Sequence, residues 1–276
     1  MSLNNILFPM ISLGGLGIVF GSLLGYASKK FAVEVDPRVP VIRDILPGAN
    51  CGGCGYAGCD ACAKAMVEGE AAPNACPVGG SETAKKIGEV LGLKVDASVR
   101  KAAFVKCNGT CSNAKNKYEY TGIADCRDAA LLSGGGYKGC SYGCLGLGSC
   151  VKVCEFGALS IVNGVAVIDE NKCTSCGKCV KTCPKGLIEI VPVDNKVRVM
   201  CNSKDKGKDV KDNCAVGCIG CRMCERACQF GAIIFENNLA KIDYEKCTQC
   251  NACALKCPTK AIKGLLVNKE SIEVVS

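Results

Sequence analysis

Apolar residues form one long uncharged run near the N-terminus and, farther along the chain, short alternating stretches. The run extends from Ile6 to Ala27 and is followed at once by Lys29 and Lys30. As a helix it would be about 33 Å long, and the hydrocarbon core of a bilayer is roughly 30 Å thick. Basic residues collect on the cytoplasmic side of membrane helices. The run therefore predicts a single-pass transmembrane helix in the cell (inner) membrane, with the remaining residues in the cytoplasm.

A cleaved signal peptide is the alternative interpretation of this run. A signal peptide carries basic residues ahead of its apolar stretch, and residues 1–5 have no charged side chain. It would also deliver the many thiols of this chain to an oxidising compartment. The sequence therefore favours a retained membrane anchor.

Two later stretches alternate apolar and other residues around a short turn. They read FGALSIVNGVAVID at 156–169 and FGAIIFENNLAKID at 230–243, which are 74 residues apart. Alternation with a period of two on both sides of an Asn-Gly or Asn-Asn pair is typical of a β-hairpin. The sequence therefore predicts the same small hairpin twice.

Cysteine dominates the composition. The chain has 26 cysteines in 276 residues, no histidine, no tryptophan and 5% aromatic residues. The absence of histidine excludes imidazole catalysis and metal sites with imidazole ligands. With few rings to fill a large core, small modules built around something that the cysteines hold are expected. A disulfide scaffold is the alternative, but it is typical of short secreted chains.

The first dense group of cysteines lies in the glycine-rich loop LPGANCGGCGYAGC. Its expected ligands are Cys51, Cys54, Cys59 and Cys76. Thiolates spaced two and four residues apart can occupy neighbouring corners of a [4Fe–4S] cube, and a distant fourth thiolate completes it. A structural zinc site is the alternative, but such sites present two separated cysteine pairs.

A two-cluster ferredoxin pattern occurs near the C-terminus. In this pattern the first three cysteines of each run hold one cluster, and the fourth crosses to the other cluster. One predicted set is Cys218, Cys221, Cys224 and Cys257, and the other is Cys247, Cys250, Cys253 and Cys228.

The same pattern occurs 74 residues earlier with one break, because Leu147 stands where the later copy has Cys221. Cys140, four residues before Cys144, is the expected substitute. One predicted set is therefore Cys140, Cys144, Cys150 and Cys183, and the other is Cys173, Cys176, Cys179 and Cys154.

Six cysteines remain after these five [4Fe–4S] sets. They are Cys62, Cys107, Cys111, Cys126, Cys201 and Cys214. Two of them end similar strand-like segments, FVKCN and RVMCN. Two interpretations stay open: a sixth cluster held by Cys107, Cys126, Cys201 and Cys214, with Cys111 as a competing ligand, or buried free thiols.

These patterns predict an α+β chain of small, cofactor-stabilised modules. The expected order is a transmembrane anchor (1–30), an Fe–S module (31–80), a linker and connecting region (81–126), a first ferredoxin-like unit (127–200) and a second (201–276). No Walker motif suggests a bond-making active site, and no catalytic residue is expected on this chain.

The anchor, the LPGANCGGCGYAGC loop with Cys76-Pro77, and the ferredoxin repeats in that order resemble the B subunit of the Rnf electron-transport complex. The resemblance covers nearly the whole chain, and the two ferredoxin units are typical of the longer members. It implies a membrane complex, a translocase, that oxidises reduced ferredoxin, reduces NAD and moves Na⁺ or H⁺. Such a chain would accept electrons from soluble ferredoxin and relay them toward the membrane subunits.

Other functions remain as alternatives at this point. The chain could be a polyferredoxin subunit of a different membrane oxidoreductase, or a scaffold that carries clusters. A basic face could attract an acidic ferredoxin; the candidates are Lys204, Lys206, Lys208, Lys211, Arg222 and Arg226. A solvated linker is the plainer interpretation of the lysines, because aspartates alternate with them. Nucleic acid is not an expected partner, since the charge is diffuse.

Overall fold

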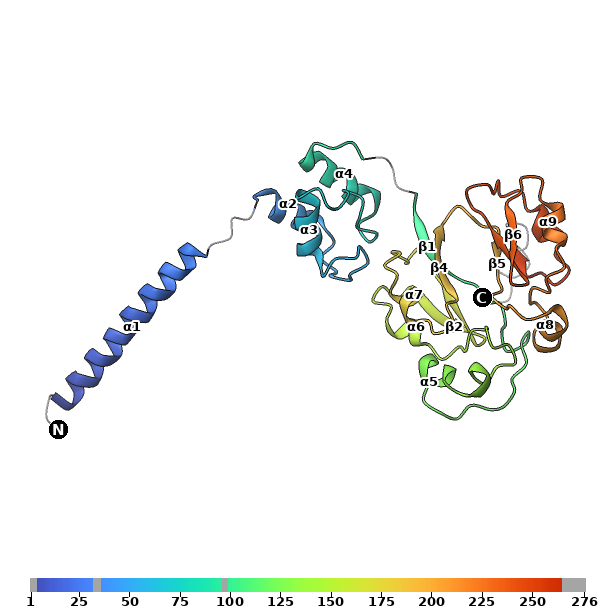
Figure 1. Cartoon of the computed structure of the whole chain (residues 1–276), viewed down its shortest axis with the longest axis horizontal. Helices are drawn as coiled ribbons and strands as arrows, with labels where there is room; N and C mark the ends of the chain where they lie inside the picture. The colour runs from blue at the N-terminus through green and yellow to red at the C-terminus, as the bar shows by residue number, and fades with distance from the viewer. Residues whose placement is uncertain (1–3, 32–35, 96–98, 265–276) are drawn as a thin grey trace.

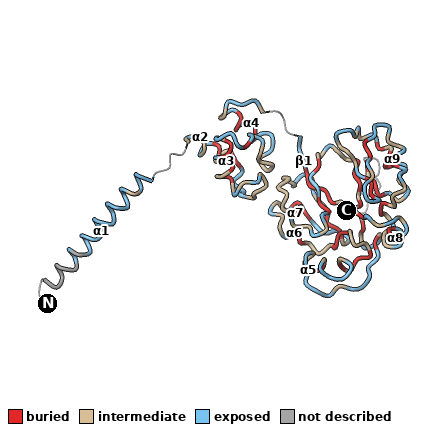
Figure 2. Tube along the Cα trace, in the orientation of Figure 1, coloured by how far each residue is buried: buried red, intermediate tan, exposed pale blue. Residues whose placement is uncertain are grey.

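The computed structural model describes residues 4–31, 36–95 and 99–264. Helix α1 (Asn4–Lys30) stands apart from the rest of the chain (Figure 1). Its described large apolar side chains, such as Leu13, Ile18 and Leu24, are exposed, as the pale blue trace of this helix also indicates (Figure 2).

The prediction of a transmembrane helix is wrong for the residues that the structure describes. Among them, no helix combines the length and the apolar character that crossing a membrane requires.

A small helical module follows α1. It consists of α2 (Arg38–Ile45), α3 (Cys59–Val67) and α4 (Gly80–Leu91). The apolar faces of these helices enclose a core in which Ile42, Ala63 and Ile87 are fully buried. The cysteine-rich loop runs between α2 and α3, so the core of the module holds one side of that loop in place.

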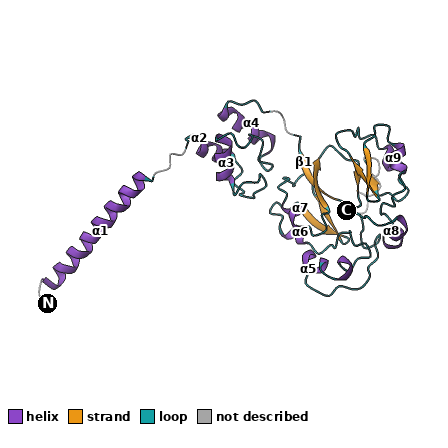
Figure 3. Cartoon of the chain, viewed as in Figure 1, coloured by secondary structure: helices purple, strands orange, loops and turns teal. Residues whose placement is uncertain are grey.

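The remaining described residues form two similar α+β units built on short antiparallel strand pairs (Figure 3). The first contains β1 (Lys101–Val105), α5 (Cys126–Ala130), the 3₁₀ turn η1 (Ser133–Gly135), α6 (Ser149–Lys152), β2 (Leu159–Val162), β3 (Val165–Ile168), α7 (Lys178–Thr182) and β4 (Ile188–Pro192). The second contains β5 (Arg198–Val199), α8 (Gly207–Asn213), α9 (Met223–Ala227), β6 (Ile233–Glu236), β7 (Leu239–Ile242), α10 (Ala252–Leu255) and β8 (Ile262–Lys263).

Both predicted hairpins are confirmed. Strand β2 pairs with β3, and β6 pairs with β7. The turn residues Asn163 and Gly164, and likewise Asn237 and Asn238, all have positive φ angles between 47° and 74°. Asparagine and glycine tolerate this left-handed conformation better than other residues, which is why these pairs form the two-residue turns.

A second strand pair closes each unit. Strand β1 pairs with β4, and β5 pairs with β8. Residues 101–105, expected in a connecting region, therefore belong to the sheet of the first unit. Each of these first strands is followed by a cysteine at the same spacing, Cys107 after Val105 and Cys201 after Val199.

An ion-pair network joins the two units. Glu170, just after β3, accepts hydrogen bonds from Arg198 at 2.6 Å and from Lys196 at 2.5 Å. Arg198 is 8% exposed, donates to the carbonyl of Asn195 at 2.6 Å and lies over the ring of Phe104 in β1. Burial would raise the pKa of Glu170, but the hydrogen bonds from Lys196 and Arg198 outweigh it, so this pKa lies below its usual value.

Glu170→Gln should therefore destabilise the two-unit body by about 1–3 kcal/mol at neutral pH, because Arg198 stays buried without its anion. A carboxyl whose pKa is lowered on folding stabilises the fold above its unfolded pKa of about 4.3 and loses this effect as the pH falls through its folded pKa. The difference between the variant and the natural chain should accordingly shrink in acid. Urea unfolding followed anaerobically at several pH values measures it.

Glu236→Gln is the matched control for this experiment. Glu236 pairs with Lys241 at 2.5 Å, but both side chains are more than half exposed, 54% and 55%. Solvent screens such a pair, so this variant should unfold within about 0.5 kcal/mol of the natural chain. Equal effects of the two substitutions would contradict the role assigned to Glu170.

Candidate metal centres

Two groups of four thiols line separate cavities in the second unit. Cys218, Cys221, Cys224 and Cys257 surround one cavity. Cys228, Cys247, Cys250 and Cys253 surround the other. These are the two groups that the ferredoxin pattern predicts for this unit. Residues with positive φ, such as Gly220 and Gln249, turn each loop so that its cysteines face inward, and α9 and α10 then carry the third cysteine of each run.

One group of the first unit follows the same plan. Cys154, Cys173, Cys176 and Cys179 line a single cavity. The N–H of Ala103 in β1 donates to the sulfur of Cys173 at 3.3 Å, so the strand pair that closes the unit also fixes a thiol.

The other group of the first unit differs from the predicted one. Cys144, Cys150 and Cys183 share their cavity with Cys126, and Cys140 does not line it. Cys126 begins α5, and its N–H donates to the hydroxyl of Ser149 at 2.6 Å. Ser149 is buried beside Cys150, so this hydrogen bond brings Cys126 close to that group. Cys126 thereby supplies the thiol that is missing at Leu147.

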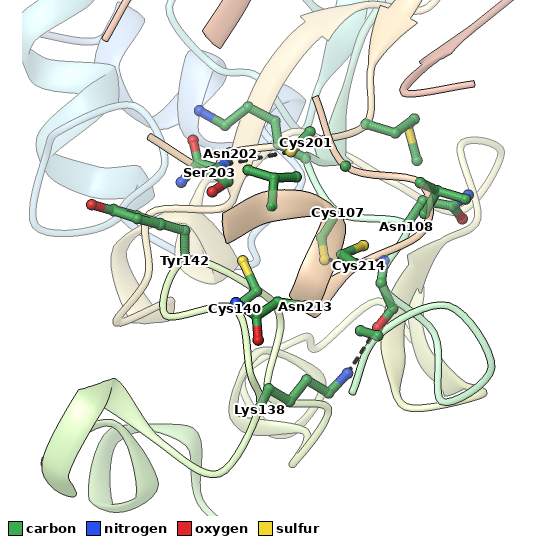
Figure 4. Close-up of a pocket in the computed structure, with 18 of the residues that line it drawn as sticks. Cys107, Asn108, Lys138, Cys140, Tyr142, Cys201, Asn202, Ser203, Asn213 and Cys214 are labelled. Atoms are coloured by element: carbon green, nitrogen blue, oxygen red, sulfur yellow. Dashed lines mark hydrogen bonds between the residues drawn. The ribbon is translucent and has the colours of Figure 1, made fainter. Parts of the chain in front are cut away.

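Cys140 lies instead in a central cavity between the two units. The thiols of Cys107, Cys140, Cys201 and Cys214 surround it (Figure 4). The structure therefore exchanges two residues relative to the sequence prediction, with Cys126 in the first unit and Cys140 in the sixth group. Gly139 explains the close approach, because a Cβ atom at this position would lie 2.5 Å from the side-chain oxygen of Asn213 in α8.

A signal for this exchange is present in the sequence. Cys140 and Cys214 are themselves 74 residues apart, the same offset that relates the two units. Cys107 and Cys201 end the matching segments FVKCN and RVMCN. The central group thus takes two corresponding thiols from each repeat, whereas Cys126 has Met200 as its partner at the repeat offset.

The cysteines of the remaining predicted group, Cys51, Cys54, Cys59 and Cys76, lie in the N-terminal module, where their shared ligation stays a prediction. Cys54, Cys59 and Cys76 pack against the core of this module together with Cys62. Asn50 shapes the loop, because its side-chain oxygen accepts the N–H of Cys59 at 2.8 Å. Burial, followed by interactions with Cys54, raises the pKa of Cys62 to about 12. Cys111 is exposed and lines none of the described cavities.

The thiols have the surroundings that a buried, sulfur-ligated group requires. Burial, with neighbouring Cys144 and Cys126 next in effect, raises the pKa of Cys150 to about 12. Burial raises the pKa of Cys224 to about 12 as well, with Cys218 next in effect. A positively charged core would convert such thiols to thiolates and release their protons.

Backbone N–H groups point at the sulfurs in these cavities. The N–H groups of Gly109 and Cys144 both donate to the sulfur of Cys107 at 3.4 Å. The N–H of Ala232 donates to Cys228 at 3.4 Å. Hydrogen bonds of this kind stabilise thiolate charge and tune a bound cluster. Among the described residues, no three acidic or cysteine side chains converge closely enough to hold a single metal ion. The residues present fit [4Fe–4S] clusters.

Family models agree with this interpretation of the cavities. A 4Fe-4S binding domain model matches residues 165–188, and another matches residues 240–263. An Fe-S cluster model matches residues 46–78. The fold, the thiol groups and these matches define a ferredoxin-type iron–sulfur protein.

Relatives extend along nearly the whole chain. The B subunit of an ion-translocating oxidoreductase complex from Methanosarcina acetivorans is 52% identical over 91% of this chain and 95% of its own length. The B subunit of the Na⁺-translocating ferredoxin:NAD⁺ oxidoreductase complex from Acetobacterium woodii is 51% identical, covering 95% and 79%. The proton-translocating counterpart from Clostridium ljungdahlii is 44% identical, covering 96% and 94%. The chain belongs to the family formed by the B subunits of these Rnf-type complexes, and the resemblance seen in its motifs is confirmed.

Proposed function

We propose that this chain accepts electrons from reduced ferredoxin and relays them within an ion-translocating ferredoxin:NAD oxidoreductase complex. The observation that carries the proposal is a series of four-thiol groups in which each group lies close to another in the fold. When bound, [4Fe–4S] clusters exchange single electrons. The named relatives from Acetobacterium woodii and Clostridium ljungdahlii support ferredoxin as the donor and the other subunits of the complex as partners.

Six thiol groups are proposed as the ligand sets. They are Cys51, Cys54, Cys59 and Cys76; Cys154, Cys173, Cys176 and Cys179; Cys126, Cys144, Cys150 and Cys183; Cys107, Cys140, Cys201 and Cys214; Cys218, Cys221, Cys224 and Cys257; and Cys228, Cys247, Cys250 and Cys253.

Contacts between neighbouring thiol groups support their arrangement as a single series for electron transfer. A Cβ atom on Gly53 would lie 2.9 Å from the carbonyl of Cys176, so the N-terminal module meets the first unit there without an intervening side chain. Cys150 and Cys179, from the two groups of the first unit, lie in one buried core. The N–H of Cys144 donates to the sulfur of Cys107.

The series continues into the second unit. The backbone of Cys218 donates to the thiol of Cys201. Cys224 and Cys253, from the last two groups, share one apolar core with Cys201. The central group thus lies where the two units meet, which makes it the connection between them.

The second unit is the proposed approach for the donor. Cys250 is exposed, so a soluble partner can come close to the group of Cys228, Cys247, Cys250 and Cys253. Lys204, Lys208 and Lys211 are also exposed on this unit and favour an acidic partner. Because ion translocation requires a membrane, we place the chain at the inner membrane, on the cytoplasmic side, through its partner subunits.

Anaerobically purified full-length protein should contain about 24 iron and about 24 acid-labile sulfide per chain, four of each for every group. Reduced ferredoxin should bleach its visible absorption within the mixing time of a stopped-flow experiment. Zinc in place of iron would contradict the cluster assignment. Iron-replete protein that reduced ferredoxin leaves unbleached would contradict the proposed donor.

Double substitutions distinguish the two candidate ligand sets of the first unit. Cys126→Ala with Cys150→Ala removes two thiols of one group, so the pair should lose about the same four iron as either single variant. Cys140→Ala with Cys150→Ala removes thiols from two groups and should lose about eight. Iron per chain and EPR spin count after reduction are the measurements.

Cys111→Ala is the control for these variants, because this exposed thiol belongs to no group, and it should keep the full iron content. The reverse pattern, with about eight iron lost from the Cys126 pair and about four from the Cys140 pair, would restore the assignment based on the sequence alone.

A further inference from the structure

A buried lysine lies against the central thiol group. Lys138 is 3% exposed, and its ammonium donates to the carbonyls of Gly109 and Gly164, each at 2.9 Å. It lines the same cavity as Cys107, Cys140 and Cys214, and in Figure 4 its side chain lies below these thiols, with a dashed hydrogen bond at its ammonium. A bridge between Asn116 and Lys138 holds its backbone in place.

Nothing acidic neutralises this charge in the described part of the chain, where no ion pair includes Lys138 and its two hydrogen-bond partners are neutral carbonyls. Other charges near the cavity are engaged or more exposed. Lys106 and Asp205 also line the cavity; Lys106 pairs with Glu189, and Asp205 accepts a hydrogen bond from Ser203 and forms no ion pair with Lys138. A buried ammonium without an anion is costly, so the fold is expected to supply a negative charge close by.

The thiol groups on either side are the available source of that charge. Lys138 lines the central cavity together with Cys214. Cys144, from the neighbouring group of the first unit, donates its N–H to the sulfur of Cys107 in the central group. Lys138 therefore lies at the junction of the two units, next to the central group.

We propose that Lys138 is the buried counter-charge of the central thiol group and raises the reduction potential of the cluster held there. This inference rests on the proposed function, since it requires a cluster in the central cavity. Four thiolates around an oxidised [4Fe–4S] core carry a charge of about −2, and one added electron makes it about −3. A fixed cation in a poorly screened site favours the more negative state. Lys138 thus acts through its charge and is not a ligand. It favours the reduced state of the cluster at the junction of the two units.

The test is an EPR-monitored redox titration of the full-length protein. Lys138→Gln removes the charge but keeps a hydrogen-bond donor for the carbonyls of Gly109 and Gly164. The central component of the titration is identified by its absence from Cys201→Ala, which should also lose about four iron. In Lys138→Gln this component should shift to lower potential, with the iron content unchanged. A titration curve identical to that of the natural chain would overturn the proposal.

Lys211→Met is the matched control. Lys211 lies in α8, three residues before Cys214, but it is exposed, so solvent screens its charge. Its titration should match that of the natural chain, and a shift as large as that of Lys138→Gln would mean that overall charge, not the buried lysine, sets the potential.

Lys138→Arg covers the case in which Lys138→Gln loses iron. Retention of the central iron in Lys138→Arg, with loss in Lys138→Gln, supports a need for positive charge. Loss of iron from both variants assigns Lys138 a packing role and overturns the proposal. If Cys201→Ala loses no iron, the sixth ligand set of the proposed function fails instead, which separates the two failures.

Discussion

The requirement that four thiols meet around each bound cluster governs the rest of this structure. In the described part of the chain the helices that carry these cysteines are short and every strand pairs with one other strand, so neither provides an extensive core. Several cysteines of the thiol groups, including Cys107, Cys150, Cys201 and Cys224, are themselves buried core residues. With clusters bound as proposed, thiol ligation would take the place that large aromatic side chains have in other folds of this size, and folding would be coupled to metal binding.

Charge follows from the same requirement. The chain has a formal charge of +8. Six clusters with four thiolates each would contribute about −12, so the loaded protein would be near −4. The basic residues therefore compensate largely for the bound clusters, and Lys138 is an internal example of such compensation. The ion pairs of Glu170 with Lys196 and Arg198 serve a different purpose, since they join the two units through side chains outside the thiol groups.

The repeat of the ferredoxin-like unit explains how a continuous series of thiol sites can arise. Each unit has a closing strand that ends at a cysteine, Cys107 or Cys201, and a loop that carries a second one, Cys140 or Cys214. Neither pair of thiols is sufficient for a four-ligand site within its own unit. When the two units pack together, the two pairs face one cavity. A site at the junction is therefore a consequence of having two copies, and it joins thiol groups that would otherwise lie in separate bodies.

Local spacing in the sequence was enough to predict the two hairpins, the iron–sulfur class, and thiol groups such as Cys154 with Cys173, Cys176 and Cys179. These features depend on residues close together in the chain or related by the ferredoxin pattern. The same local pattern predicted a membrane helix from 6–27, which the described residues do not support. Only the tertiary structure decided that Cys126 joins Cys150 and that Cys140 faces Cys214. Those pairings depend on the buried hydroxyl of Ser149 and on the close approach at Gly139, which are contacts between distant segments. Spacing limits which thiols can share a cluster, but packing decides which of them do.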